Sequence, residues 1–199
     1  TSVDININVI DTLPVLTEVD TDGDGIPDNV EGYADSNSNG IPDYLDNIAQ
    51  CNVMPGKLTD RNQYLVQGDA GVCLSKGAVV LFSFASALQL DATQLIADDE
   101  AQIIGGLFDF VLNNLPVAGQ SYNVVLPQRL PIPTHALYRK FHQGQWQDFI
   151  EDDANQLFSA QGEPGYCPSP GSADYQAGLI EGYHCVQLRI QDGGPNDDD

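Results

Sequence analysis

Apolar and polar residues alternate through much of the chain after residue 50, which is the pattern of β-strands that bury one face. Short alternating segments separated by glycine and proline are typical of antiparallel sheets. We therefore predict that residues 51–199 form a mainly β domain, an antiparallel β-sandwich. The candidate strands are residues 63–67, 72–74, 77–90, 107–115, 122–126, 156–160 and 186–190, with a hairpin at 136–150 that turns near Gln143-Gly144.

Two segments outside this pattern allow more than one interpretation. Residues 3–10 alternate strictly, so residues 1–16 are predicted to hold an N-terminal strand. This strand either pairs with the main domain or is the last strand of an upstream domain, and the sequence does not distinguish the two. Residues 91–105 are the helical candidate, although their polar, alanine-rich pattern is ambiguous.

Residues 17–50 contain few large apolar groups and carry one acidic pattern twice, with the copies 15 residues apart. The first copy reads DTDGDGIPDNVE and the second reads DSNSNGIPDYLD. A calcium loop places side-chain oxygens at positions 1, 3, 5, 9 and 12, a backbone carbonyl at position 7 and a glycine at position 6. Both copies fill all of these positions. The predicted ligands are Asp20, Asp22, Asp24, Asp28 and Glu31 with the carbonyl of Ile26, and Asp35, Asn37, Asn39, Asp43 and Asp46 with the carbonyl of Ile41.

Calcium (Ca2+) is favoured over magnesium because Mg2+ demands tight octahedral geometry and retains its water ligands. We expect two or more calcium ions. The second copy should bind more weakly or share ligands with the first, because Asn37 and Asn39 stand where the first copy has aspartates. Ile26 and Ile41, each followed by proline, are expected to pack inward, and residues 44–48 to form a short helical turn.

The net charge of the 199-residue chain is −22, which argues against a nucleic-acid partner because phosphate binding requires a basic patch. Residues 1–56 hold eleven acidic side chains and no lysine or arginine, and bound cations would offset much of their repulsion. No run of 18 apolar residues is present, so no membrane span is predicted. The sequence begins without methionine or a signal peptide, and we expect it to be a fragment of a longer precursor.

The four cysteines, Cys51, Cys73, Cys167 and Cys185, form an even set with no CxxC pair. This favours disulfides and an oxidising, extracytoplasmic compartment over zinc or redox chemistry. Three pairings are possible, and we favour the one between sequence neighbours, Cys51 with Cys73 and Cys167 with Cys185. Each bridge would then close a loop of about 20 residues, worth roughly 3 kcal/mol.

The sequence does not predict an enzyme. It contains no GxSxG nucleophile elbow, GxGxxG fingerprint or P-loop. His135, His142 and His184 lack the spacing of a zinc site, and we interpret them as surface or partly buried structural residues. Acidic residues are abundant, so a pair suited to glycoside hydrolysis carries no weight on its own.

Aromatic residues gather in two places. Tyr138, Phe141, Trp146 and Phe149 lie along the predicted hairpin, and Tyr166, Tyr175 and Tyr183 lie near the predicted Cys167–Cys185 loop. Either group would suit a surface that contacts a glycan, a peptide or another protein. Core packing and cross-strand pairing are the more common role of such rings, so we favour that interpretation for the hairpin. For the tyrosine-rich segment we favour an ordinary loop closed by a disulfide.

Residues 20–46 resemble bacterial thrombospondin type 3 repeats, a family of calcium-binding, mostly irregular segments. The resemblance rests on DTDGDGIPDNVEG followed by DSNSNGIPDYLD. The array differs from the animal repeats in having no internal cysteine, which puts their disulfide-linked wrapping in doubt but leaves the calcium loops.

Residues 57–199 resemble the choice-of-anchor U domain, an extracellular β-rich domain near the C-terminus of bacterial surface proteins. The residues that carry this resemblance are PTHALYRKFHQGQWQDF, GEPGYCP and YQAGLIEGYHCVQLRIQDGGPNDDD. In that family a sorting signal follows the glycine- and aspartate-rich end, so the resemblance implies a surface-anchored parent protein. It implies no catalytic residues. Residues 192–199 are a candidate for a further cation-binding turn.

Together these patterns predict a non-enzymatic calcium-binding module of a bacterial cell-surface or secreted protein. Residues 17–50 would be a linker that calcium makes rigid, and the β-sandwich would follow it. The alternative is an adhesin-type module whose sandwich recognises a glycan, a peptide or a surface protein. A sensor of the EF-hand kind is not expected, because no pair of helices flanks the loops.

Overall fold

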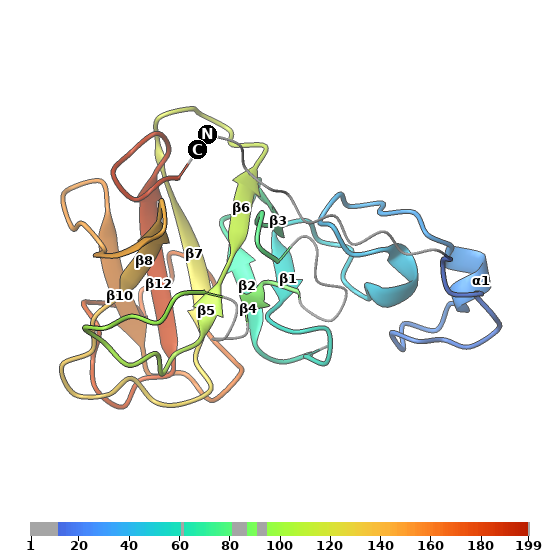
Figure 1. Ribbon diagram of the computed structural model, residues 1–199, viewed down its shortest axis with the longest axis horizontal. Helices are drawn as coiled ribbons and strands as arrows, with labels where there is room; N and C mark the ends of the chain where they lie inside the picture. The colour runs from blue at the N-terminus through green and yellow to red at the C-terminus, as the bar shows by residue number, and fades with distance from the viewer. Residues whose placement is uncertain (1–11, 61, 81–86, 91–94, 199) are drawn as a thin grey trace.

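The structure, a computed structural model, describes residues 12–60, 62–80, 87–90 and 95–198. It is mainly β, with 29% of residues in strands and 4% in helices, and its sheets are antiparallel as predicted. Figure 1 shows a β-sheet body from which the first described residues extend to one side as an irregular arm. The arm holds the short helix α1 (Asp28–Glu31), and the 3₁₀ turn η1 (Asp43–Leu45) follows it. The strand predicted at residues 3–10 lies outside the described residues.

Two layers form the β body. A six-stranded antiparallel sheet in the order β1-β2-β7-β12-β10-β11 is the first layer. Three two-stranded ribbons, β3-β6, β4-β5 and β8-β9, lie over it (Figure 1). The strands are β1 (Val53–Pro55), β2 (Leu65–Gly68), β3 (Cys73–Lys76), β4 (Gln89–Leu90), β5 (Leu107–Phe108), β6 (Phe110–Asn113), β7 (Ser121–Pro127), β8 (Arg139–His142), β9 (Gln145–Asp148), β10 (Gln156–Ala160), β11 (Gln176–Ala177) and β12 (Cys185–Gln191).

The alternation of β7 and β12 decides which face of the large sheet is buried. These strands pair along their whole length, with Leu126 opposite Val186 and Val124 opposite Leu188. Directly opposed residues share one face of a sheet, so the four side chains form one apolar patch. Each is at most 4% exposed. The apolar positions predicted at residues 122–126 and 186–190 are therefore confirmed as core.

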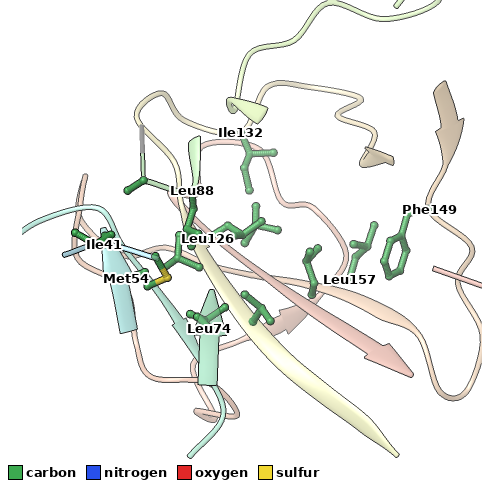
Figure 2. Packing of buried hydrophobic residues seen from close by; sticks show 13 residues of the cluster. Ile41, Met54, Leu74, Leu88, Leu126, Ile132, Phe149 and Leu157 are labelled. Atoms are coloured by element: carbon green, nitrogen blue, oxygen red, sulfur yellow. The ribbon is translucent and has the colours of Figure 1, made fainter. Parts of the chain in front are cut away.

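The ribbons cover this apolar face. Leu74 of β3 is fully buried in the core cluster, and Phe108 and Leu112 pack against the cluster from β5 and β6. Figure 2 shows the cluster running from Ile41, Met54 and Leu74 at one end to Leu157 and Phe149 at the other. The arm thus contributes Ile41 to the core of the sandwich.

The predicted hairpin is confirmed, with its turn at Gln143-Gly144. Both residues have positive φ values, 49° and 82°, which is the backbone of a type I′ turn. This turn matches the twist of the strands that it joins, and glycine adopts it without steric cost.

Both disulfides pair sequence neighbours, as predicted. Cys51 bonds to Cys73, and Cys167 bonds to Cys185. The first ties the end of the arm to β3, close to the point where Leu74 N donates to Cys51 O at 2.6 Å. The second closes a loop that lies against the outer face of the sheet, where Gly171 N donates to Gln187 Oε1 at 2.7 Å.

Two predictions for the middle of the chain differ from the structure. The helical candidate at residues 91–105 is wrong for 95–105, the part that the structure describes, because this stretch is irregular. Its polar side chains make local turns instead, as where Glu100 N donates to Asp98 Oδ1 at 3.0 Å. In the strand candidate at 77–90, residues 78–80 form a turn and β4 supplies the pairing, while residues 81–86 lie outside the described residues.

Candidate metal centre

The two acidic copies fold into similar loops, in each of which the first aspartate accepts hydrogen bonds from the glycine N at position 6 and from one earlier backbone N. Asp20 accepts hydrogen bonds from Gly23 N at 2.7 Å and from Gly25 N at 3.0 Å. Asp35 accepts from Asn39 N at 3.0 Å and from Gly40 N at 2.9 Å. The glycine at position 6 has a φ of 99° in the first loop and 87° in the second, values that favour glycine.

In each loop the carboxylate at position 9 accepts hydrogen bonds from the residue at position 2. Asp28 accepts hydrogen bonds from the backbone N and the hydroxyl of Thr21, both at 2.7 Å. Asp43 accepts the equivalent pair from Ser36 at 2.8 and 2.7 Å. Sequence reasoning placed Asp28 and Asp43 among the ligands and did not recognise Thr21 and Ser36 as their partners. A hydroxyl residue directly after the first aspartate of each copy was the available signal.

In the first loop, three carboxylates converge. Oxygen atoms of Asp20, Asp22 and Asp24 all lie within 4.8 Å of one another, and this is the single such group of potential metal ligands in the part of the chain that the structure describes. The side chain of Asp22 is buried, at 2% exposure, whereas Asp20 and Asp24 face the solvent. Three negative groups this close repel one another unless a cation lies between them.

Two carboxylate oxygens in this region are buried without a hydrogen-bond partner, Asp22 Oδ2 and Glu31 Oε2. Burial, together with the nearby charges of Asp22 and Asp24, raises the pKa of Glu31 to about 7. Burial also raises the pKa of Asp22, with Asp24 and Asp20 adding to the effect. An unpaired buried carboxylate is costly, so these two oxygens mark a place where a positive charge fits.

The ligand types in the first loop suit calcium. All of them are hard oxygen donors from one short segment, and calcium accepts several carboxylates in a flexible arrangement. The segment is closed by a hydrogen bond from Tyr33 Oη to Pro14 O, and Asp28 N donates to Val19 O at 2.8 Å. These bonds hold both ends of the loop in place around the carboxylate group.

The second loop has a different interior. The side-chain amides of Asn37 and Asn39 donate to Asp46 Oδ2 at 2.8 and 2.7 Å. Asn37 Nδ2 also donates to Ile48 O at 2.9 Å. Burial raises the pKa of Asp46, and the two amide hydrogen bonds oppose that rise. The structure therefore brings the predicted ligands at positions 3, 5 and 12 together, but as hydrogen-bonded partners.

The two isoleucines behave differently. The expectation that both pack inward is confirmed for Ile41, which is 1% exposed, and wrong for Ile26, which is 44% exposed. The second loop meets the sandwich directly, since Lys76 N of β3 donates to Asn39 O at 3.2 Å. The first loop, which leads into α1, lies further out along the arm (Figure 1).

The other candidate ligands take protein partners. His142 Nδ1 and Lys140 Nζ lie 2.5 and 3.5 Å from Asp198 Oδ1, so a histidine and a lysine face this acid of the C-terminal segment. Asp192 Oδ2 accepts from Gly119 N at 2.6 Å, and Asp197 Oδ2 accepts from Gly193 N at 2.8 Å. Within the described residues, neither this segment nor any histidine belongs to a metal-ligand group.

The aromatic residues of the hairpin mostly pack within the protein. Tyr138 and Phe149 meet edge to face with ring centroids 5.8 Å apart, and Phe149 is buried in the core. Phe141 and Trp146 are cross-strand partners with centroids 5.2 Å apart. This arrangement is the one favoured from the sequence. Near the second disulfide, Tyr166 is 53% exposed.

A hollow of about 870 Å³ lies between the ribbons and the large sheet. Apolar residues such as Leu126 and Val186 line it, together with Arg139. Arg139 already faces acids: its Nη1 lies 2.8 Å from Asp148 and 2.9 Å from Glu100, and its Nε lies 2.7 Å from Asp98, although without a hydrogen bond of acceptable geometry. The first acidic loop, with its unpaired carboxylate oxygens, is therefore the better candidate for a functional site.

Comparisons of the chain with protein-family models, with curated proteins and with solved structures found no match. Among the described residues, no helix has both the length and the apolar character needed to cross a membrane. The two disulfides are consistent with an extracellular protein.

Proposed function

We propose that this chain is a calcium-binding, non-enzymatic module in which the ion makes the arm before the β-sandwich rigid. The observation that carries the proposal is the pair of buried, unpartnered oxygens, Asp22 Oδ2 and Glu31 Oε2, beside the converging group of Asp20, Asp22 and Asp24. A divalent cation bound by these carboxylates would supply the missing partner for both oxygens.

The effect of the ion is mechanical. Each close pair of carboxylates repels by on the order of 1 kcal/mol even in water, so without a cation the carboxylates of the first loop would repel one another. A cation converts the same carboxylates into ligands of one centre, and the arm loses freedom. Extracellular modules often bind calcium with a Kd of about 10⁻⁴–10⁻³ M, so millimolar external calcium would suffice to fill even a weak site.

The setting that we propose is the outside of a bacterial cell, as part of a secreted or surface-anchored protein. Two disulfides support an oxidising compartment. The resemblances to thrombospondin type 3 repeats and to the choice-of-anchor U domain point the same way. In this setting calcium would fix the direction in which the sandwich projects from the segment before it.

Thermal unfolding of the full chain with and without calcium tests the proposal. We expect millimolar calcium to raise the melting temperature, because a ligand that binds only the folded state stabilises it. Asp22→Asn should remove most of this rise, whereas Asp153→Asn, an exposed carboxylate outside the repeats, should leave it intact. Equal melting temperatures in calcium and in chelator, together with no heat of calcium binding by titration calorimetry, would refute the proposal.

A further inference from the structure

We propose that the second acidic loop does not bind calcium. Hydrogen bonds from two asparagine amides hold it closed and take the place of the ion. The protein would then bind one calcium ion in its repeats, and calcium would control only the outer part of the arm. This inference rests on the proposed function of the first loop, and it assigns the two copies opposite roles.

The orientation of the two amides is set by the backbone. Asn39 Oδ1 accepts a hydrogen bond from Ile41 N at 2.7 Å, and Asn37 Oδ1 accepts from Asn39 N at 3.2 Å. Only the oxygen of an amide can accept these bonds. The NH2 group of each side chain must therefore point the other way, toward the interior of the loop.

The first loop uses the same backbone bonds with a different result. Asp24 Oδ1 accepts from Ile26 N at 2.7 Å, and Asp22 Oδ1 accepts from Asp24 N at 3.1 Å. One oxygen of each aspartate is thus used as in the second loop. The remaining atom is a negatively charged oxygen in the first loop and an NH2 donor in the second, so the same fold presents opposite polarity to the interior.

Both amide groups of the second loop donate to the same carboxylate, that of Asp46. Asp46 stands at position 12, where Glu31 stands in the first loop, and its Oδ2 accepts from both amides. Glu31 Oε2 has no partner. To hold a cation, the second loop would have to turn both amides over, which breaks their hydrogen bonds to Asp46 and to the backbone. The loss of these bonds weighs against this change, because a hydrogen-bonded group that loses its partner destabilises the fold.

A protein cation and an apolar anchor also lie beside the second loop. The side chain of Lys76 packs against Gly40, where an added Cβ would lie 3.5 Å from the lysine Cδ. Ile41, in the core of the sandwich, holds the loop in place without any metal.

The boundary between the calcium-dependent and the calcium-independent part of the arm lies between Gly32 and Asp35. Gly32 ends α1 with a φ of 78°, and Tyr33 contacts Tyr44 across the boundary with ring centroids 5.9 Å apart. Removal of calcium should loosen the residues before this point and leave those after it docked. Calcium would then control the rigidity of the first copy, while the second copy stays packed against the sandwich with or without calcium.

Native mass spectrometry and titration calorimetry of the full chain with Ca2+ test the inference by counting ions. We expect one ion for the natural sequence, none for Asp22→Asn/Asp24→Asn, and two for Asn37→Asp/Asn39→Asp, which restores the charge pattern of the first loop. Two ions on the natural sequence, or one ion retained by Asp22→Asn/Asp24→Asn, would overturn it. Failure of Asn37→Asp/Asn39→Asp to gain an ion would show that the amides are not what excludes calcium.

Hydrogen exchange on the natural sequence gives a second readout that needs no variant. Chelation should speed amide exchange at residues 20–31 and leave that of residues 35–46 unchanged. Calcium-dependent protection of both copies would contradict the inference while supporting the proposed function. No bound ion and no change in exchange anywhere would instead refute the proposed function itself.

Discussion

Truncating the two equivalent isoleucines tests how unequally the loops are attached to the sandwich. Ile41→Ala removes a side chain that is 1% exposed and belongs to the same core cluster as Met54 and Leu74. Such a change typically costs 2–5 kcal/mol, because apolar burial is lost and a cavity remains. Ile26→Ala, at 44% exposure, should change the free energy of unfolding by no more than about 0.5 kcal/mol.

Urea unfolding followed by the fluorescence of Trp146 would measure both variants under identical calcium concentrations. For a chain of this size, the expected loss for Ile41→Ala corresponds to a fall in melting temperature of roughly 4–20 °C. The experiment should be repeated in chelator, where the difference between the variants should persist, since Ile41 packs without the help of a metal. Equal losses for the two variants, or a loss for Ile41→Ala that appears only with calcium present, would refute this account of the arm.

Two further predictions concern ionisation and covalent bonding. In calcium-depleted buffer, the raised pKa of Glu31, about 7 against 4.5 in the unfolded chain, contributes stability that is present below pH 4.5 and is lost as the pH rises through 7. Glutamine at position 31 cannot ionise, so the melting temperature of Glu31→Gln should rise relative to that of the natural protein as the pH increases from 5 to 8. In saturating calcium the natural protein should instead melt at the higher temperature. Replacing both Cys51 and Cys73 by serine should lower the free energy of unfolding by roughly 3 kcal/mol, because their bridge closes a loop with a sequence separation of 22.

Each of these two predictions has a clear contrary result. A constant difference between Glu31→Gln and the natural protein across that pH range would mean that Glu31 is not buried beside other acids. A loss below about 1 kcal/mol in the serine variant would mean that the unfolded chain is already constrained in this region. Urea titration under non-reducing conditions, with the Cys167–Cys185 bridge intact, gives the required comparison.

The fold was predictable wherever one face of a strand is buried. The alternation at Val186, Leu188 and Ile190 predicted β12, because a period of two has no other common explanation in a short segment. The hairpin was predictable from Gln143-Gly144, where the backbone requires left-handed residues. The structure of residues 95–105 was not predictable. Their polar side chains are compatible with either a helix or turns, and tertiary contacts determine which of these forms.

The sequence predicted two acidic loops, but it did not predict how the two loops differ. The spacing of the aspartates identified both copies, since ligands must recur at fixed positions in a loop. What the spacing could not reveal is that Asp28 binds Thr21, or that Asp46 accepts from two amides. The unequal burial of Ile26 and Ile41 was equally hidden, because two identical GIPD segments differ only in what lies next to them in space.

The central pairing of β7 with β12 has a consequence for the order in which the molecule forms. These strands are residues 121–127 and 185–191, so the middle of the large sheet joins segments that are far apart in the sequence. Closing such a long loop has an entropic cost that must be met before the contacts form, and proteins rich in distant pairings fold in milliseconds to seconds. The acidic loops, built from bonds within a few residues of one another, can form early. The acidic loops would thus be formed before the chain completes the slow search for its central strands.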